Sequence, residues 1–193
     1  MSTNERVCIF IDGSNLYHSL KHECDKTNLD FTKFIDWLVE ERKLVRAYYY
    51  NVPLHASSNL EQVKSQQRFF DGLKRISYFD VRLGRLEPRG NTYVEKGVDV
   101  QVAVDMLSMA VRNIYDTAIL VSCDGDYAVA IRAVKETGKH VEVACFPKAY
   151  HVREAADRVR DLNKDTLRDF WRQVESSHIT PPPRQGSIGL VNN

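Results

Sequence analysis

Four aspartates stand where predicted strands end, at Asp12, Asp99, Asp124 and Asp126. The carboxyl ends of the strands form the ligand crevice of an open α/β sheet, so we expect these carboxylates to converge. Two unit charges about 4 Å apart repel by roughly 4 kcal/mol at an effective dielectric constant of 20, so the cluster needs protonation or a cation. Donors that are all oxygens favour Mg²⁺ or Mn²⁺ over zinc. The pattern therefore predicts metal-assisted phosphate chemistry.

Three nearby polar residues are candidate contacts to a bound phosphate, and each has a plainer alternative role. Asn15 lies one helical turn after Asp12, where its amide reaches the same pocket or makes a hydrogen bond at the helix start. Ser122 lies two residues before Asp124 and orients a ligand or makes a turn hydrogen bond. Lys96 neutralises a phosphate or faces solvent.

Charge is unevenly distributed along the chain. Residues 64–96 hold eight Lys and Arg against four Asp and Glu, whereas residues 97–126 hold one Arg against five Asp. An acidic centre beside a basic segment suits a polyanion held over a metal, and Arg82 and Arg85 are the predicted contacts to flanking phosphates. Two ordinary solvated faces explain the same charges equally well.

Asp105 is a secondary candidate within the segment 97–112. This segment is apolar nearly all round, which predicts a helix buried on all sides. Asp105 lies six residues after Asp99, about 240° further round a helix, so the two side chains do not share a face. We therefore rank Asp105 below the other four aspartates as a candidate site residue.

Composition limits the class of protein. The 193 residues suit one domain, and 27 Lys and Arg against 26 Asp and Glu create no global basic field. The four cysteines lack metal-ligand spacing and are interpreted as reduced thiols. No signal core or apolar run of 18 residues is present, which predicts a cytoplasmic protein without a membrane segment. A composition change predicts a domain over 1–175 and a flexible, Pro-containing tail over 176–193.

Strand and helix patterns alternate along the chain. A capping box at Ser58 and Glu61 marks one helix start, and the tyrosines at 48–50 are interpreted as core residues. Alternation at this spacing implies parallel βαβ units and an α/β fold. The predicted strands are 7–11, 44–52, 78–86, 118–122 and 140–146, and a short edge strand is expected near 159–162. The predicted helices begin at 13, 30 and 60 and cover 97–112 and 127–135.

Three motifs together resemble the NYN domain family, and most closely its LabA-like branch, which is related to PIN-domain nucleases. They are FIDGSN at residues 10–15, KGVD at 96–99 and LVSCDGD at 120–126, and the resemblance covers about residues 5–163. Tyr127 stands where the family usually has Phe, which we interpret as a change in packing more than in chemistry.

The resemblance implies a Rossmann-like, PIN-like three-layer sandwich with a mostly parallel central sheet. It also implies an acidic pocket for Mg²⁺ or Mn²⁺, in which Asp12, Asp99, Asp124 and Asp126 are the metal-binding and catalytic residues and Asn15 is their polar companion. The implied activity is hydrolysis of RNA phosphodiester bonds. RNA is the expected partner, DNA is not excluded, and the sequence leaves a homodimer open.

A non-catalytic regulator is the competing interpretation. LabA-like proteins include members linked to clock-output gene regulation in cyanobacteria, and such a protein acts through nucleic-acid or protein partners. A retained set of carboxylates favours catalysis, because a scaffold gains nothing from their mutual repulsion.

Overall fold

The computed structural model describes residues 4–55, 59–89 and 92–172. A six-stranded sheet with the order β3-β2-β1-β6-β7-β8 forms its centre, and every neighbouring pair in this sheet is parallel. Its strands are β1 (Arg6–Asp12), β2 (Lys43–Asn51), β3 (Phe79–Leu83), β6 (Thr117–Val121), β7 (His140–Cys145) and β8 (Arg158–Asp161). The α/β fold with a parallel sheet, predicted from the sequence, is confirmed.

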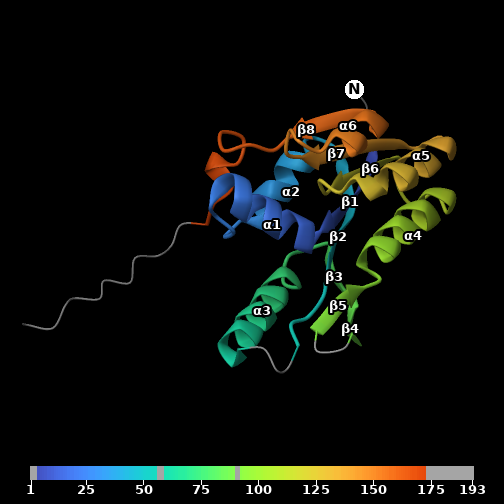
Figure 1. The fold of residues 1–193 in the computed structure, drawn as a ribbon. Coiled ribbons are helices and arrows are strands. Elements are labelled where there is room, and N and C mark those ends of the chain that lie inside the picture. Colours follow the sequence, from blue (N-terminus) through green and yellow to red (C-terminus); the bar gives the residue numbers. More distant parts are fainter. Residues whose placement is uncertain (1–3, 56–58, 90–91, 173–193) are drawn as a thin grey trace, which may run out of the picture.

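Helices cover both faces of the sheet and make three layers (Figure 1). One face carries α1 (Gly13–Cys24), α2 (Phe31–Val39) and α3 (Leu60–Leu73). The other face carries α4 (Val98–Val111), α5 (Ala128–Glu136) and α6 (Tyr150–Ala155). Two single-turn 3₁₀ helices, η1 (Gly125–Tyr127) and η2 (Arg168–Phe170), complete the helical segments of the described chain.

The central strand β1 supplies side chains to both cores. Val7, Ile9 and Ile11 pack into the core beneath α1–α3, whereas Cys8 and Phe10 pack into the core beneath α4–α6. This division follows from the two-residue period of a strand, and it explains why residues 7–11 of β1 are apolar without interruption. Because β1 is buried from Val7 to its end at Asp12, that carboxylate is held on a rigid support.

Helix starts follow the capping rules. The Asp30 side chain accepts hydrogen bonds from the backbone nitrogens of Thr32 and Lys33, so α2 begins where the sequence predicted. At α3 the capping oxygen belongs to Asn59, which accepts from the Glu61 nitrogen at 2.9 Å. The predicted capping residue Ser58 lies outside the described residues, as does the predicted tail 176–193.

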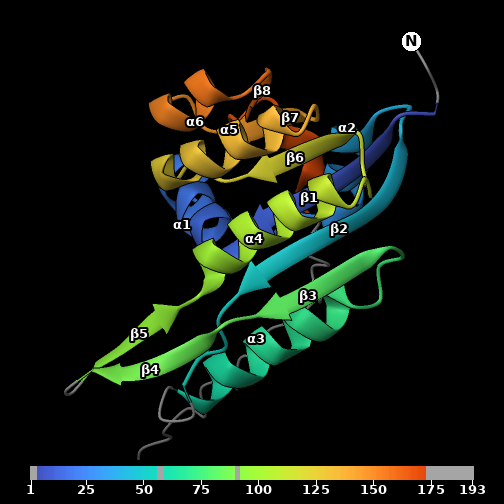
Figure 2. The same cartoon turned by 90° about the vertical axis from the view of Figure 1, so that its right-hand side faces the viewer.

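The predicted strand 78–86 is wrong as a single element. The chain forms β3, breaks at Gly84, and continues as β4 (Arg85–Arg89), which pairs antiparallel with β5 (Thr92–Lys96). A Cβ atom at Gly84 would lie 3.0 Å from both the Lys96 carbonyl oxygen and a Val98 methyl carbon. The β4–β5 arm extends away from the sheet and leads directly into α4 (Figure 2).

Helix α4 is not buried on all sides, which corrects the expectation for 97–112. Val102 and Met106 are fully buried against the sheet, whereas Val100, Val104 and Val111 are each more than half exposed. The apolar content of the sequence therefore overstated the burial, because the outer face of this helix is also apolar. None of the helices in the described ranges combines the length and apolar character needed to cross a membrane.

An ion-pair cluster joins β7, β8 and the end of α2. Glu142 is buried and contacts Arg42 at 2.8 Å and Arg160 at 2.7 Å. Burial raises the pKa of Glu142, but the hydrogen bonds from the two arginines outweigh it and the net pKa lies below its ordinary value. Glu40 accepts from Arg160 and Arg158, and these bonds lower its pKa from 4.5 to about 2.

The cluster predicts acid-sensitive stability. The folded-state pKa of Glu40 lies below its unfolded value, so its contribution is present above pH 4.5 and is lost as the pH falls toward 2. Thermal unfolding across a pH series should therefore show a falling Tm in this window. Glu40→Gln should lower the Tm at neutral pH and flatten the acid slope. Glu136→Gln, at the exposed end of α5, should leave the slope unchanged; equal slopes in both variants and the unmodified protein would contradict the assignment.

Candidate functional site

The acidic pocket lies where the direction of chain winding reverses. From β1 the chain proceeds to β2 and β3 on one side, whereas β6 leads to β7 and β8 on the other. The crevice between two such strands is the usual ligand site of an open parallel sheet. Asp12 ends β1 and Asp124 follows β6, so the sheet topology alone brings these two carboxylates to one edge.

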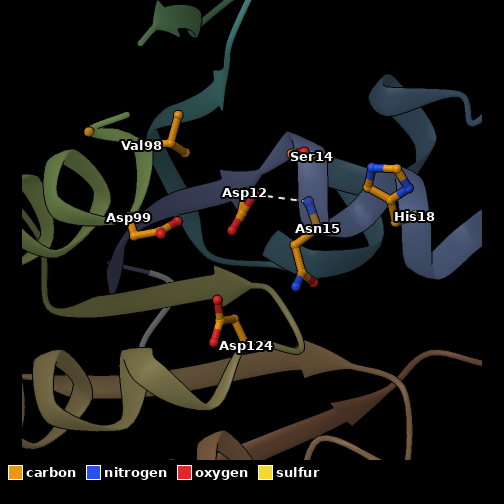
Figure 3. A pocket seen from close by; sticks show the side chains of 8 residues that line it. Asp12, Ser14, Asn15, His18, Val98, Asp99 and Asp124 are labelled. Carbon is orange, nitrogen blue, oxygen red and sulfur yellow. Dashed lines mark hydrogen bonds between the residues drawn. The ribbon is translucent and has the colours of Figure 1, made fainter. Parts of the chain in front are cut away.

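A cavity of about 290 Å³ opens at this edge. Figure 3 shows the side chains of Asp12, Asp99 and Asp124 directed toward the same space from β1, α4 and the start of η1. The lining residues are Asp12, Ser14, Asn15, His18, Gly97, Val98, Asp99 and Asp124. The structure thus brings three of the four predicted carboxylates together.

Asp12 is the most buried of the three, with 3% of its surface exposed. One carboxylate oxygen accepts a hydrogen bond from the Asn15 backbone nitrogen at 3.0 Å, and the other accepts from the Tyr127 hydroxyl at 3.0 Å. Burial raises the pKa of Asp12, and the negative charges of Asp99 and Asp124 raise it further, while the two hydrogen bonds oppose the shift. The net rise shows that the pocket opposes negative charge on Asp12.

Asp99 enters the pocket from the first turn of α4. Gly97 precedes this helix with φ +85°, a left-handed conformation that favours glycine and turns the chain from β5 into α4. The Asp99 carboxylate accepts from the same Tyr127 hydroxyl at 3.2 Å. One hydroxyl therefore lies between two carboxylates, and both burial and these charges raise the pKa of Tyr127 far above its ordinary value.

Asp124 caps the single turn η1. Its side-chain oxygen accepts from the Asp126 nitrogen at 3.0 Å, and its own nitrogen donates to the Ser122 hydroxyl at 3.1 Å. Asn15 braces the same loop, because its side-chain oxygen accepts from the Cys123 nitrogen at 2.8 Å. These bonds tie the segment after β6 to the start of α1 and fix the Asp124 carboxylate opposite Asp12.

The family model described as NYN domain matches residues 6–163. The chain belongs to the NYN domain family. The family assignment made from the three motifs is thereby confirmed.

One curated protein and one solved structure are similar to this NYN domain protein over most of their length. The Low amplitude and bright protein LabA of Synechococcus elongatus is 29% identical over 180 residues, covering 88% of this chain and 89% of that protein. A crystal structure of a protein of unknown function from Vibrio parahaemolyticus superposes with a TM-score of 0.70 at 24% identity, covering 86% of this chain and 97% of that one. The second likeness supports the fold alone.

Several predicted site residues of the NYN domain lie outside the pocket lining. Asp126 is exposed on η1, so its part in metal binding stays a prediction. Ser122 is buried, and its hydroxyl accepts a turn hydrogen bond from the Asp124 nitrogen. A turn hydrogen bond was the alternative to ligand binding that the sequence left open for this residue. Arg85 is exposed and pairs with Glu87 at 3.0 Å, and Lys96 is exposed next to the lining residue Gly97.

Arg82 and Asp105 form a separate network beneath α4. The Arg82 guanidinium pairs with the Asp105 carboxylate and lies 4.2 Å from the centre of the Tyr48 ring. The Tyr50 hydroxyl donates to the same Asp105 carboxylate at 2.9 Å. Tyr48 and Tyr50 are core residues, as predicted, and the helical-phase argument correctly separates Asp105 from Asp99. A phosphate contact by Arg82 would compete with this ion pair.

Sequence reasoning missed Tyr127 and His18. The change from Phe to Tyr was interpreted as a packing difference, yet the added hydroxyl contacts two of the acidic residues. His18 lies one helical turn after Asn15 and therefore faces the same pocket, a spacing that could have identified it. Gly13 also matters locally, because a Cβ atom there would overlap the Tyr49 ring where β1 turns into α1.

The donor chemistry of the pocket fits a hydrated hard cation. Asp12, Asp99 and Asp124 offer only oxygen ligands, and Mg²⁺ usually keeps several waters while binding one or two carboxylates. Across residues 4–55, 59–89 and 92–172, no three His, Cys, Asp or Glu side chains are placed closely enough to form a ready-made metal cage. The Tyr127 hydroxyl lies between Asp12 and Asp99. The pocket therefore suits a cation that retains water ligands rather than a closed structural site.

Proposed function

We propose that this NYN domain protein is a divalent-metal-dependent ribonuclease. The observation that carries the proposal is the pocket at the β1–β6 junction, whose lining includes Asp12, Asp99 and Asp124. Three carboxylates facing one cavity, one of them with a raised pKa, form a strongly negative site that a cation would stabilise. Membership of a family related to nucleases supports phosphodiester hydrolysis as the reaction.

The residues that line the pocket would have separate roles in metal binding, loop positioning and phosphate contact. Asp12, Asp99 and Asp124 would hold Mg²⁺ or Mn²⁺, which supplies charge stabilisation and an activated water when bound. Asn15 fixes the relative position of α1 and the Asp124 loop through its bond to the Cys123 nitrogen. His18 borders the open side of the pocket and could donate a hydrogen bond to a substrate phosphate.

Flanking phosphates would contact the exposed cations beside the pocket. Lys96 is exposed at the end of β5, one residue before the pocket-lining Gly97. Arg85 is exposed at the start of β4, opposite Lys96 in the antiparallel pair. These two side chains give sequence-independent affinity for a polyanion. Arg82 would contact a flanking phosphate only if its ion pair with Asp105 were broken.

A LabA-like regulatory role is the second candidate function. The observation that favours it is the match to LabA, which extends over nearly all of both chains. The Tyr127 hydroxyl also favours the regulatory role, because it gives the Asp12 and Asp99 carboxylates a hydrogen-bond donor from the protein itself. In this role the pocket would be a stable structural feature and RNA would not be cut.

Cleavage of a labelled single-stranded RNA pool distinguishes the two functions. We expect the purified protein to cut RNA with Mn²⁺ or Mg²⁺ and to be inactive with EDTA. DNA of matching sequence in parallel reactions reports whether the substrate is restricted to RNA. Binding of RNA without cleavage under every metal condition would contradict the nuclease proposal and favour the regulatory role.

A further inference from the structure

A second cavity lies beside the acidic pocket, and we call it the α1–β7 pocket. Its volume is about 360 Å³, near the lower end of the range for small-molecule sites. One wall belongs to α1 and the other to the chain that follows β6 and β7, so it lies at the same edge of the sheet as the acidic pocket. The lining residues are His18, Ser19, His22, Glu23, Cys123, Phe146, Lys148 and Ala149.

Two features join the α1–β7 pocket to the acidic pocket. His18 lines both cavities, and Figure 3 shows its ring on α1, one turn beyond Asn15. Cys123 lines the α1–β7 pocket, and the next residue, Asp124, lines the acidic pocket. A ligand that reaches Asp124 and extends beyond a single phosphate group therefore has the α1–β7 pocket directly beside it.

The α1–β7 pocket combines buried apolar side chains with exposed polar ones. Phe146 and Ala149 are almost completely buried, with 4% and 7% of their surface exposed. By contrast, the side chains of His22 and Lys148 are 73% and 82% exposed. An apolar interior with a few polar groups at its mouth suits a heteroaromatic ring, which buries its faces and makes hydrogen bonds at its edge.

Charge favours a nucleobase over a phosphate as the occupant. Glu23 Oε1 lies 3.0 Å from His22 Nδ1 and 3.5 Å from Lys148 Nζ. The hydrogen bond with His22 is the main cause of a lowered pKa at Glu23; burial opposes the shift and the charge of Lys148 adds to it. Glu23 is therefore negatively charged at neutral pH and offsets the charge of Lys148. A phosphate in this cavity would be repelled by the carboxylate, whereas an uncharged base would not.

Glu23 also has an oxygen available for a base. Within the described part of the chain, its Oε2 atom has no hydrogen-bond partner, and its side chain is 33% exposed. A carboxylate accepts a hydrogen bond from the exocyclic amino group of cytosine. Uracil has a carbonyl oxygen in the same position, which a carboxylate repels.

We propose that the α1–β7 pocket binds the nucleobase of the nucleotide next to the phosphate held at the acidic pocket, and that Glu23 favours cytosine over uracil there. The choice of RNA as the ligand rests on the proposed function. The α1–β7 pocket positions the strand and takes no part in breaking the phosphodiester bond.

Alkylation of Cys123 reports whether the α1–β7 pocket is occupied. Cys123 is partly exposed, whereas the other three cysteines are buried, so iodoacetamide should label Cys123 first. The full chain is labelled in EDTA with oligo(C), oligo(U) or a sugar–phosphate oligomer of equal length without bases, and mass spectrometry gives the rate. Oligo(C) should slow labelling at about fivefold lower concentration than oligo(U), because only cytosine offers an amino group. The oligomer without bases should leave the rate unchanged.

Glu23→Gln tests the selection of the base. Glutamine adds an N–H donor that can pair with the uracil carbonyl oxygen, so the difference between oligo(C) and oligo(U) should disappear. Glu61→Gln is the matched control, because Glu61 on α3 also pairs with a lysine at 3.5 Å but does not line the α1–β7 pocket. This variant should keep the preference for oligo(C).

The outcomes separate this proposal from the nuclease proposal. Protection by oligo(C) that needs bases, exceeds that by oligo(U) and depends on Glu23 supports the subsite. Equal protection by the oligomer without bases, equal protection by oligo(C) and oligo(U), no protection at all, or an unchanged preference in Glu23→Gln would overturn it. Because EDTA is present throughout, a protein that cuts RNA with Mn²⁺ but fails this test remains a nuclease without the subsite. Base-dependent protection without cleavage would leave the subsite and remove the nuclease.

Discussion

Asp124→Asn is expected to reduce metal-dependent RNA cleavage by about three orders of magnitude. The substitution removes one of three negative charges that face the cavity, and a bound metal contributes several kcal/mol of charge stabilisation, with 1.36 kcal/mol for each tenfold change in rate. Asparagine keeps a side-chain oxygen that can accept from the Asp126 nitrogen, so the cap of η1 survives. Single-turnover cleavage with Mn²⁺ measures the rate, and thermal unfolding checks the fold.

The matched control for this experiment is Asp25→Asn. Asp25 is exposed at the end of α1 in a left-handed conformation that asparagine also tolerates. This variant should retain full cleavage. Asp126→Asn decides the open role of that residue, since a loss comparable to that of Asp124→Asn would extend the site to η1. Unchanged cleavage in Asp124→Asn would place the chemistry elsewhere.

Tyr127→Phe is expected to lower the stability of the metal-free protein by about 2 kcal/mol, or ~4–8 °C in Tm. The hydroxyl lies within hydrogen-bond distance of Asp12 and Asp99, and its removal leaves the buried Asp12 carboxylate with the hydrogen bond from the Asn15 backbone nitrogen. Mn²⁺ should then raise the Tm of the variant more than that of the unmodified protein, because the cation no longer competes with the hydroxyl. Differential scanning calorimetry with and without Mn²⁺ measures both effects.

Tyr115→Phe provides the control for loss of a buried hydroxyl. Tyr115 is fully buried and donates to the Met106 carbonyl oxygen at 2.6 Å, away from the acidic pocket. This variant should lose stability without any change in its response to Mn²⁺. If Tyr127→Phe and Tyr115→Phe respond identically to the metal, the hydroxyl does not compete for the carboxylates.

The sequence was sufficient for the features that depend on local pattern. The apolar run of β1 and the Asp30 cap of α2 are local signals, and the structure has both elements where they were predicted. The convergence of Asp12 and Asp124 was predictable as well, because parallel strands end at one edge of a sheet. The motifs FIDGSN and LVSCDGD contain these two aspartates, and the family that they resemble is the one that matches residues 6–163.

The features that sequence reasoning missed depend on tertiary context. The break at Gly84 follows from the close approach of Lys96 and Val98, which no local pattern reveals. An all-apolar helix predicts burial, yet only the arrangement around the sheet decides that one face of α4 stays exposed. The contacts of Tyr127 with Asp12 and Asp99 likewise join residues 115 and 28 positions apart in the chain.

The most direct test of the nuclease account is single-turnover cleavage of labelled RNA by the unmodified protein and Asp12→Asn, each with Mn²⁺ and with EDTA. Asparagine retains an oxygen that can accept from the Asn15 nitrogen, so the variant isolates the lost charge from a change in fold. The account predicts Mn²⁺-dependent cleavage that EDTA abolishes and that Asp12→Asn lacks. Equal cleavage by both proteins, or cleavage that persists in EDTA, would contradict it.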